Sequence, residues 1–260
     1  MLLAIDMSNT GIKFGLYEDS QMRARWRIST VRDKTSDEYA MLLGELLRHA
    51  GYDYAAIDAV IISSVVPPLT PVFQALALDY CHRDAIVVDH TLDVGVRLLT
   101  ENPWETGTDR IMSTLAAHRL YGGPAIVIQC GTATSFDVVS AEGDFLGGAI
   151  APGLGISAEA LARAASRLYQ VELTAPPQAI GRNTIHSMQS GIVYGHVGLV
   201  EGLVARLRRE LPGGDHAKII AHGGLAEIVA SATPVIEIVN QSLILEGLRL
   251  AYAYLTAKTH

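Results

Sequence analysis

The stretch LLAIDMSNT at residues 2–10 runs from an apolar segment into small and hydroxyl-bearing residues. The segment Leu2–Ile5 predicts a buried strand, and Phe14–Tyr17 beyond the turn predicts a second one. A strand that delivers Asp6 to such a turn brings backbone N–H groups to a polyphosphate and a carboxylate to the water shell of a magnesium ion. The alternative is a plain β-hairpin in which Asp6 and Asn9 serve only turn chemistry.

A second corner of this kind recurs past the middle of the chain. The apolar run Pro124–Gln129 leads into the small residues 130–134, and Ser135–Val139 again has strand character. IDMS at 5–8 can be laid over IQCG at 128–131. Because internal repetition reflects repeated architecture, we expect two related lobes that face each other across a cleft. The competing interpretation is again an ordinary hairpin.

A third corner follows the predicted strand Lys218–Ala221. There Gly223 and Gly224 open a helical segment, and the N-terminus of a helix attracts anions. One such corner is weak evidence by itself. Three corners at strand ends, spread over both halves of the chain, predict a nucleotide-binding protein.

Short apolar runs alternate with helix-period segments, which is typical of an α/β protein with mixed, buried sheets. Chain-breaking residues gather near Tyr121–Pro124 and predict a boundary between lobes 1–122 and 123–260. We expect close packing at Tyr194, Gly195, Gly198 and Gly247. The remaining predicted elements are strands Trp26–Ser29, Val60–Ser64 and Ala85–Val88, and helices Thr35–Gly51 (capped by Ser36), Pro71–Tyr80, Ile111–Tyr121 and a single long Ile185–Leu211.

The composition excludes several classes of protein. With 260 residues, 49% hydrophobic and 18% charged, the chain can form two well-packed lobes. A net charge of -7 without a run of Lys and Arg argues against a nucleic-acid partner. Cys81 and Cys130 lie among apolar or small residues, which favours reduced thiols and a cytoplasmic location. We expect no signal peptide, no membrane partner and no structural zinc.

The segment ENPWETGTDR at 101–110 immediately precedes the predicted helix that starts at Ile111. Asp109 and Arg110 therefore fall at the helix N-terminus, where the helix dipole stabilises a carboxylate. In that position Asp109 could accept the proton of an attacking hydroxyl, and Arg110 could hold a substrate carboxylate. Phosphoryl transfer requires little beyond such a base, positioning and charge neutralisation. The alternative is a capping or first-turn aspartate without catalytic duty.

Over nearly its whole length the chain resembles the type III pantothenate kinases, and the ordered set of matching stretches makes the resemblance specific. These stretches are IDMSNT at 5–10, WRIST at 26–30, DEY at 37–39, IISSVVPPLTP at 61–71, ENPWETGTDRI at 101–111, GTATSFDVVS at 131–140, GGAIAPGLGISAEAL at 147–161, IGRNT at 180–184 and MQSGIVYG at 188–195. The resemblance implies an α/β fold of duplicated actin-like (ribonuclease H-like) lobes, each a mixed sheet with flanking helices, and a nucleotide cleft between them. It also implies a homodimer that transfers the γ-phosphoryl group of ATP to the primary hydroxyl of pantothenate, the first step of coenzyme A biosynthesis.

The resemblance further implies roles for individual residues. Asp109 is the implied catalytic base, Asp6 the implied Mg²⁺ ligand through water, and Gln129 the implied position of a K⁺ or NH₄⁺ ion. The implied nucleotide-binding residues are Asp6, Met7, Ser8, Asn9, Thr10, Gly11, Ile12, Lys13, Gly131 and Thr132. The implied substrate-binding residues are Thr100, Gly107, Thr108, Asp109, Arg110 and Thr184.

Four positions depart from the pattern of the family. Ser8 stands where the family usually has Gly, Thr100 where it has Tyr, Gln129 where it has Asp, and His222 where it has Thr. Glycine is permissive for unusual backbone angles, and an aspartate supplies a charge that glutamine lacks. Two alternatives therefore stay open beside the pantothenate kinase: a kinase of another small hydroxy-acid, and a non-catalytic ligand-binding or accessory protein.

Overall fold

The computed structural model describes residues 1–258, and the chain divides into two compact units. The first comprises Met1–Val96, Glu101–Ala116 and the chain from Ile244 onward, and the second comprises Arg97–Thr100 and Ala117–Leu243. The last helix groups with the first unit and residues 97–100 group with the second, so neither unit is one continuous stretch of the chain. Residues 259–260 of the expected second lobe lie outside the described part of the chain.

The first unit is built on a five-stranded mixed sheet of order β3-β2-β1-β4-β5. Strands β1 and β2 pair antiparallel, whereas β1 and β4 pair in parallel. Its elements are β1 (Leu2–Met7), β2 (Gly11–Glu18), β3 (Gln21–Ser29), α1 (Ser36–His49), β4 (Ala59–Ser64), α2 (Thr70–Cys81), β5 (Ala85–Val87), most of α3 (Thr108–Tyr121) and α8 (Leu243–Ala257), with short 3₁₀ turns at Tyr54–Ala56, Pro67–Leu69 and Pro103–Glu105.

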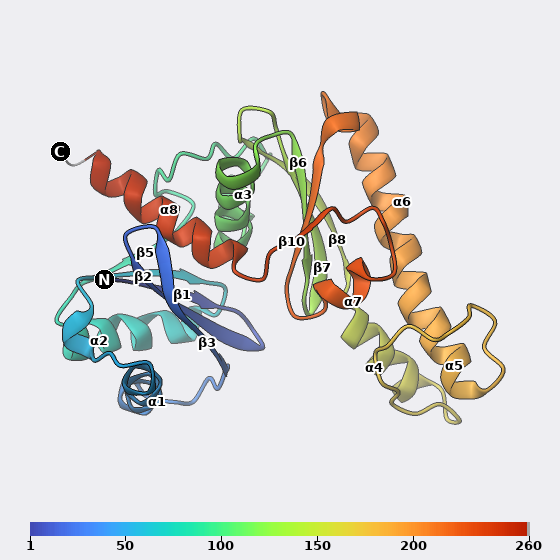
Figure 1. Ribbon diagram of the computed structural model, residues 1–260, viewed down its shortest axis with the longest axis horizontal. Helices are drawn as coiled ribbons and strands as arrows, with labels where there is room; N and C mark the ends of the chain where they lie inside the picture. Colours follow the sequence, from blue (N-terminus) through green and yellow to red (C-terminus); the bar gives the residue numbers. More distant parts are fainter. Residues whose placement is uncertain (259–260) are drawn as a thin grey trace. The chain divides into compact units, whose positions relative to one another are not determined.

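The two faces of the first sheet differ in composition. Alternate residues of β1, such as Leu3 and Ile5, join Tyr39 of α1 and Phe73 of α2 in one buried apolar cluster. Figure 1 shows α1 and α2 together on that side of the sheet. Because side chains alternate along a strand, Asp6 belongs to the opposite face. The first sheet therefore has one purely apolar face and one face that carries the candidate chemistry.

The second unit repeats this plan with a sheet of order β10-β9-β6-β7-β8. Helix α6 and the short α7 pack on one face, where Val197, Val200 and Val229 meet Ile128 and Phe136 of the sheet. Its elements are β6 (Ala125–Cys130), β7 (Ala133–Val139), β8 (Phe145–Pro152), α4 (Leu154–Ala164), α5 (Thr184–Gln189), a π-helical turn (Ser190–Tyr194), α6 (Gly195–Glu210), a 3₁₀ turn (Gly214–His216), β9 (Lys218–His222), α7 (Ala226–Ala230) and β10 (Ile238–Val239).

The two sheets have the same topology. In each, one strand pairs antiparallel with the next in sequence, which pairs antiparallel with a third, while the first strand pairs in parallel with a later one. Asp6 and Gln129 hold the same place, the penultimate residue of β1 and β6. The duplication expected from the two aligned corners is therefore confirmed at the level of strand order.

Several local expectations need correction. Thr35, and not Ser36, caps α1, because the Thr35 side chain accepts a hydrogen bond from the Glu38 backbone while the Glu38 carboxylate reaches back. The expected single helix over 185–211 contains a π-helical turn at Ser190–Tyr194. A Cβ added at Gly195 or Gly198 would meet nothing within 4 Å, so close packing was wrongly expected there, whereas one at Gly247 would lie 2.0 Å from the Met112 carbonyl oxygen. None of the described helices has the length and apolar character needed to cross a membrane.

Candidate functional site

Asp6 lies near the carboxyl end of β1 and is almost fully buried, with 1% of its surface exposed. It is paired in the sheet register with Lys13 of β2, whose ammonium nitrogen lies 3.8 Å from Asp6 Oδ2. Burial raises the pKa of Asp6 to about 7, while Lys13 lowers it and Asp109 raises it. The Asp109 carboxylate therefore lies close enough to Asp6 to disfavour its ionised form.

The second carboxylate oxygen of Asp6 is available for a ligand. Among the described residues, Asp6 Oδ1 is buried and has no hydrogen-bond partner. A buried acceptor without a partner is costly unless a ligand, ion or ordered water completes it. Magnesium prefers carboxylate and water oxygens, so this oxygen fits a hydrated magnesium ion.

The turn after β1 is held by its own hydrogen bonds. The backbone N–H and the hydroxyl of Ser8 both donate to the Gly11 carbonyl, over 3.0 and 2.8 Å. The Thr30 hydroxyl donates to the Ser8 carbonyl at 2.6 Å. Among the described non-glycine residues, only Asp19 and His82 have a positive φ. Ser8 therefore needs no glycine-like backbone angle, and its hydroxyl is directed into the turn.

Thr108 and Asp109 begin α3 next to the end of β4. The Thr108 hydroxyl oxygen lies 2.8 Å from Ser63 Oγ and accepts the backbone N–H of Ser64 at 3.2 Å. Ser63 is in register with Asp6 across the parallel β1–β4 pair. Strand pairing and this hydroxyl contact together join the Asp6 strand to the helix that carries Asp109.

The carboxylate of Asp109 folds back over the start of its own helix. Asp109 Oδ1 accepts the backbone N–H of Arg110 at 2.9 Å. A Cβ placed on Gly107 would lie 2.6 Å from the same oxygen, so the absence of a side chain at 107 makes this position possible. Asp109 and Arg110 are half-buried. A partly accessible carboxylate at a helix start suits a group that exchanges a proton with a bound ligand.

The second corner, at residues 130–134, is closely packed against the residue before α4. The backbone N–H of Gly153, just before α4, donates to the Thr132 carbonyl at 3.0 Å. A Cβ on Gly153 would lie 2.3 Å from the carbonyl oxygens of Gly131 and Thr132. Gln129 is in register with Ser135 on one side and His222 on the other. Two of the four departures from the family pattern, Gln129 and His222, are thus neighbours on adjacent strands.

Thr100 and Thr184 also belong to the second unit but occupy different elements. Thr100 follows a short bridge between Leu98 and Phe145, and its Oγ1 is buried without a hydrogen-bond partner among the described residues. Thr184 is the exposed first residue of α5, which Asn183 caps by accepting the His186 backbone N–H. Within one unit, the structure brings together Asp6, Lys13 and the Gly107–Arg110 segment.

The structure adds two residues to the candidate set. Ser63 lies in the matching stretch IISSVVPPLTP, so the resemblance contained a signal for it without indicating a role. His196 is buried on α6, and its Nε2 lies 3.1 Å from the Thr134 hydroxyl of the second corner. No sequence signal distinguishes His196 from an ordinary helix residue, because the contact spans 62 positions.

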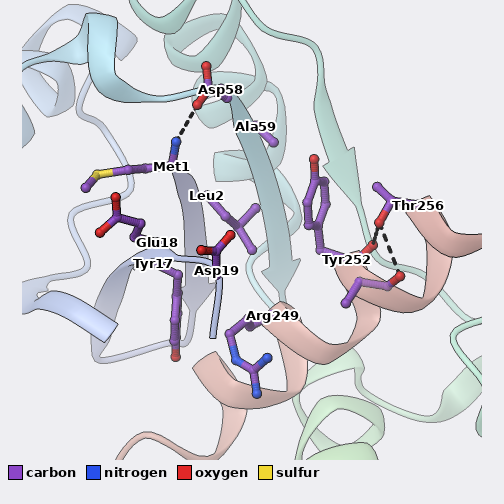
Figure 2. Close-up of a pocket in the computed structure, with 11 residues that line it drawn as sticks. Met1, Leu2, Tyr17, Glu18, Asp19, Asp58, Ala59, Arg249, Tyr252 and Thr256 are labelled. Carbon is purple, nitrogen blue, oxygen red and sulfur yellow. Dashed lines mark hydrogen bonds and ion pairs between the residues drawn. The ribbon is translucent and has the colours of Figure 1, made fainter. Parts of the chain in front are cut away.

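A cavity of about 570 Å³ opens at the other end of β1, where Leu2, Tyr17 and Asp19 face Arg249 and Tyr252 of α8 (Figure 2). Leu2 lies four residues before Asp6, a distance of roughly 13 Å along a strand. The charged groups here are largely paired, Asp58 with the Met1 nitrogen and Arg249 with Glu246. Because of the distance along β1, this cavity is separate from the carboxylates of Asp6 and Asp109.

Comparison with known proteins agrees with this geometry. The family model of type III pantothenate kinase matches residues 2–206. A type III pantothenate kinase from Roseiflexus sp. (strain RS-1) is 52% identical over 252 residues, which is 97% of this chain and 98% of that relative. Component A of (R)-2-hydroxyglutaryl-CoA dehydratase from Acidaminococcus fermentans has a TM-score of 0.58 at 14% identity, covering 99% of this chain and 98% of that one. A ROK hexokinase from Thermus thermophilus has a TM-score of 0.51 at 17% identity, covering 100% and 99%.

The duplicated mixed sheets, each with flanking helices, define an α/β fold of actin-like lobes. Within that class, the matched family model and the full-length relative settle the membership. The chain belongs to the type III pantothenate kinase family.

Proposed function

We propose that this chain transfers the γ-phosphoryl group of ATP to the primary hydroxyl of pantothenate, giving 4′-phosphopantothenate and ADP in the first step of coenzyme A biosynthesis. The observation that supports this most directly is the placement of two carboxylates within one unit: Asp6 is in register with Ser63, and the Ser63 hydroxyl contacts Thr108, the neighbour of Asp109 in the chain. Phosphoryl transfer needs charge neutralisation on the phosphate side, which a carboxylate that holds a metal ion can support, and a base on the hydroxyl side.

On the phosphate side, residues Asp6 to Lys13 bind the nucleotide, and Gly131 and Thr132 of the second unit are further nucleotide contacts. Asp6 holds magnesium through water, as its buried Oδ1 without a partner suggests. Magnesium, when bound, neutralises charge on the phosphates. Lys13 favours the ionised form of Asp6 by partly offsetting the rise in pKa that burial causes, and it adds a positive charge close to the phosphate loop.

On the hydroxyl side, Asp109 is the general base. The hydroxyl oxygen of pantothenate attacks the γ-phosphorus of ATP and forms a new O–P bond. The bond between the γ-phosphorus and the β,γ-bridging oxygen breaks, and ADP leaves with that oxygen. Asp109 accepts the hydroxyl proton in the course of this step. Arg110 binds the pantothenate carboxylate through its guanidinium group. The main chain at Gly107 and Thr108 lines the acceptor, and Thr100 and Thr184 are further acceptor contacts.

We further infer three properties of the working enzyme. Gln129 offers a carbonyl ligand without charge, so activity depends only weakly on K⁺ or NH₄⁺. The enzyme is a homodimer, as the resemblance to its family implies. Its location is cytoplasmic, which the two buried free cysteines, Cys81 and Cys130, support.

The test is magnesium-dependent formation of 4′-phosphopantothenate from ATP and pantothenate, followed by mass spectrometry. Asp109→Asn should abolish product while the thermal unfolding curve stays unchanged. Asp79→Asn, a change of an exposed carboxylate on α2, is the matched control and should keep activity. Absence of product from the wild-type protein at saturating ATP and K⁺ would exclude pantothenate as the acceptor. A titration of K⁺ in the same assay tests the role of Gln129.

A second candidate is transfer to a different small hydroxy-acid. The observation that favours it is the buried Thr100 hydroxyl without a partner, at a position where the family usually has Tyr. An acceptor with an extra polar group would satisfy that hydroxyl. A panel of hydroxy-acids assayed beside pantothenate decides between the two acceptors. Calorimetry with ATP alone shows whether the loop that carries Ser8 binds nucleotide, and absence of binding would identify a non-catalytic relative.

A further inference from the structure

The Thr108 hydroxyl makes three contacts inside the protein. It accepts the Ser64 backbone N–H at 3.2 Å, donates to the Ser64 carbonyl at 3.3 Å and lies 2.8 Å from Ser63 Oγ. A hydroxyl has one proton to donate and two lone pairs to accept with. Because the Thr108 proton is directed at the Ser64 carbonyl, Ser63 is the donor that fits the third contact, and this arrangement uses the proton and both lone pairs of the Thr108 hydroxyl.

The partner of this hydroxyl lies in the same part of the sheet as the phosphate-binding carboxylate. Ser63 is fully buried, with 0% of its surface exposed, and is in register with Asp6. Thr108 directly precedes Asp109 in the first turn of α3. The route from Asp6 to Asp109 therefore runs through one strand pair and one hydroxyl contact.

We propose that the Ser63–Thr108 hydroxyl pair is a positioning device that fixes the Asp109 carboxylate relative to Asp6, and that the Thr108 hydroxyl does not itself contact the acceptor. The proposal rests on the proposed phosphoryl transfer and deepens it. Thr108 then lines the acceptor through its main chain alone. Ser63, which touches neither substrate, becomes a residue on which the rate depends.

The hydroxyl pair places the helix but is not needed to form it. Arg110 and Ile111 donate their backbone N–H groups to the Gly107 carbonyl at 3.0 and 3.3 Å, so the first turn of α3 has its own hydrogen bonds. Loss of the pair should therefore shift Asp109 without unfolding the helix. A misplacement of about 1 Å can cost on the order of 100-fold in rate.

The experiment compares Thr108→Val, which keeps the shape and removes the hydroxyl, with Thr108→Ser, which keeps the hydroxyl, and adds Ser63→Ala and the Ser63→Ala/Thr108→Val double variant. We expect Thr108→Val and Ser63→Ala each to lower kcat by about 10- to 100-fold with the KM for pantothenate changed less than about 2-fold. Thr108→Ser should retain most of the rate. The double variant should be no slower than the slower single one, because both remove the same contact.

Thr70→Val is the matched control. The Thr70 hydroxyl of α2 donates to Ser64 Oγ at 3.0 Å in the same cluster but does not touch α3. Its loss should leave kcat unchanged. A raised KM for pantothenate with unchanged kcat in Thr108→Val would overturn the proposal, because it would show that the hydroxyl binds the acceptor. Equal losses in Thr108→Val and Thr108→Ser would overturn it as well.

A measurement made without substrate tests the positioning role of the Ser63–Thr108 pair independently of the proposed kinase activity. Amide hydrogen exchange at Arg110 and Ile111 should become faster in Thr108→Val and Ser63→Ala, and Thr108→Ser should restore the slow rate. Unchanged exchange in all variants would reject the positioning role even if the wild-type enzyme is active. If the wild-type protein makes no 4′-phosphopantothenate, the proposed function fails while the exchange result still decides the role of the pair.

Discussion

The ammonium nitrogen of Lys13 lies 3.8 Å from Asp6 Oδ2, and the two residues face each other in the register of β1 and β2. Lys13 is the counter-charge of a carboxylate that is otherwise buried. Removing one partner of a buried ion pair leaves an uncompensated charge. Lys13→Met should therefore lower the free energy of unfolding by about 3 kcal/mol at pH 8.

The same change should cost much less at pH 5. The pKa of Asp6 is raised to about 7, so Asp6 is protonated at pH 5 and needs no counter-charge. Urea unfolding without nucleotide or magnesium at both pH values measures this, with the exposed Lys218→Met as control. An Asp6→Asn background should remove the effect at pH 8. An equal cost at both pH values would contradict the ion-pair interpretation.

Gly107→Ala should slow the reaction without unfolding the protein. The new Cβ would lie 2.6 Å from Asp109 Oδ1 and would push the carboxylate away from its position. We expect kcat to fall by about 10- to 100-fold, as for any displaced catalytic group. Steady-state kinetics beside a thermal unfolding curve measures both quantities. Full activity in this variant would show that the Asp109 carboxylate moves freely and that its observed position is not the reactive one.

Gly247→Ala should destabilise the first unit. A Cβ on this residue of α8 would lie 2.0 Å from the Met112 carbonyl oxygen of α3, and a backbone atom cannot move away cheaply. Overpacking of this kind costs about 1–3 kcal/mol. Gly198→Ala on α6 is the matched control, since its Cβ meets nothing within 4 Å and alanine favours a helix by up to about 1 kcal/mol. Chemical denaturation of both variants should give changes of opposite sign.

His196 should make the fold sensitive to mild acid. Burial lowers the pKa of His196 below its ordinary 6.5, so the unfolded chain binds a proton at a pH where the folded chain does not. The unfolding free energy therefore rises with pH through this group, and its contribution is lost as pH falls below about 6.5. His196→Gln should reduce the loss of stability between pH 7 and pH 5. The exposed His49→Gln is the control, and an equal pH dependence in all three proteins would contradict the prediction.

Much of the local architecture could be predicted from the sequence. Strands β4, β5, β6 and β9 lie within one or two residues of their predicted ends, because continuous apolar runs bounded by breakers indicate buried strands. Strand β2 is longer than predicted, Gly11–Glu18, because its ends are stabilised by pairing with both neighbours and not by composition. The cap of α1 was assigned one residue too late because Thr35 and Ser36 have the same chemistry, and only geometry selects Thr35.

The sequence by itself determined where the strand-to-turn corners lie along the chain. The run into Asp6, the alignment of 5–8 with 128–131, and the placement of Asp109 at a helix start all follow from periodicity, since alternating or continuous apolar patterns depend on neighbours along the chain. The family resemblance followed from the same residues. The sequence also showed that Ser8 and Gln129 differ from the residues usual in the family, but it did not show which groups surround them in the fold.

Only the tertiary structure decided which of these residues act together. Asp6, Ser63 and Thr108 are brought together by a parallel strand pair and a hydroxyl contact spanning 45 positions. The tertiary structure also showed that Ser8 needs no unusual backbone angle, and that Gln129 and His222 are neighbours on adjacent strands. The physical reason is that hydrogen bonding and burial depend on distances in space, which strand register sets and local composition does not encode.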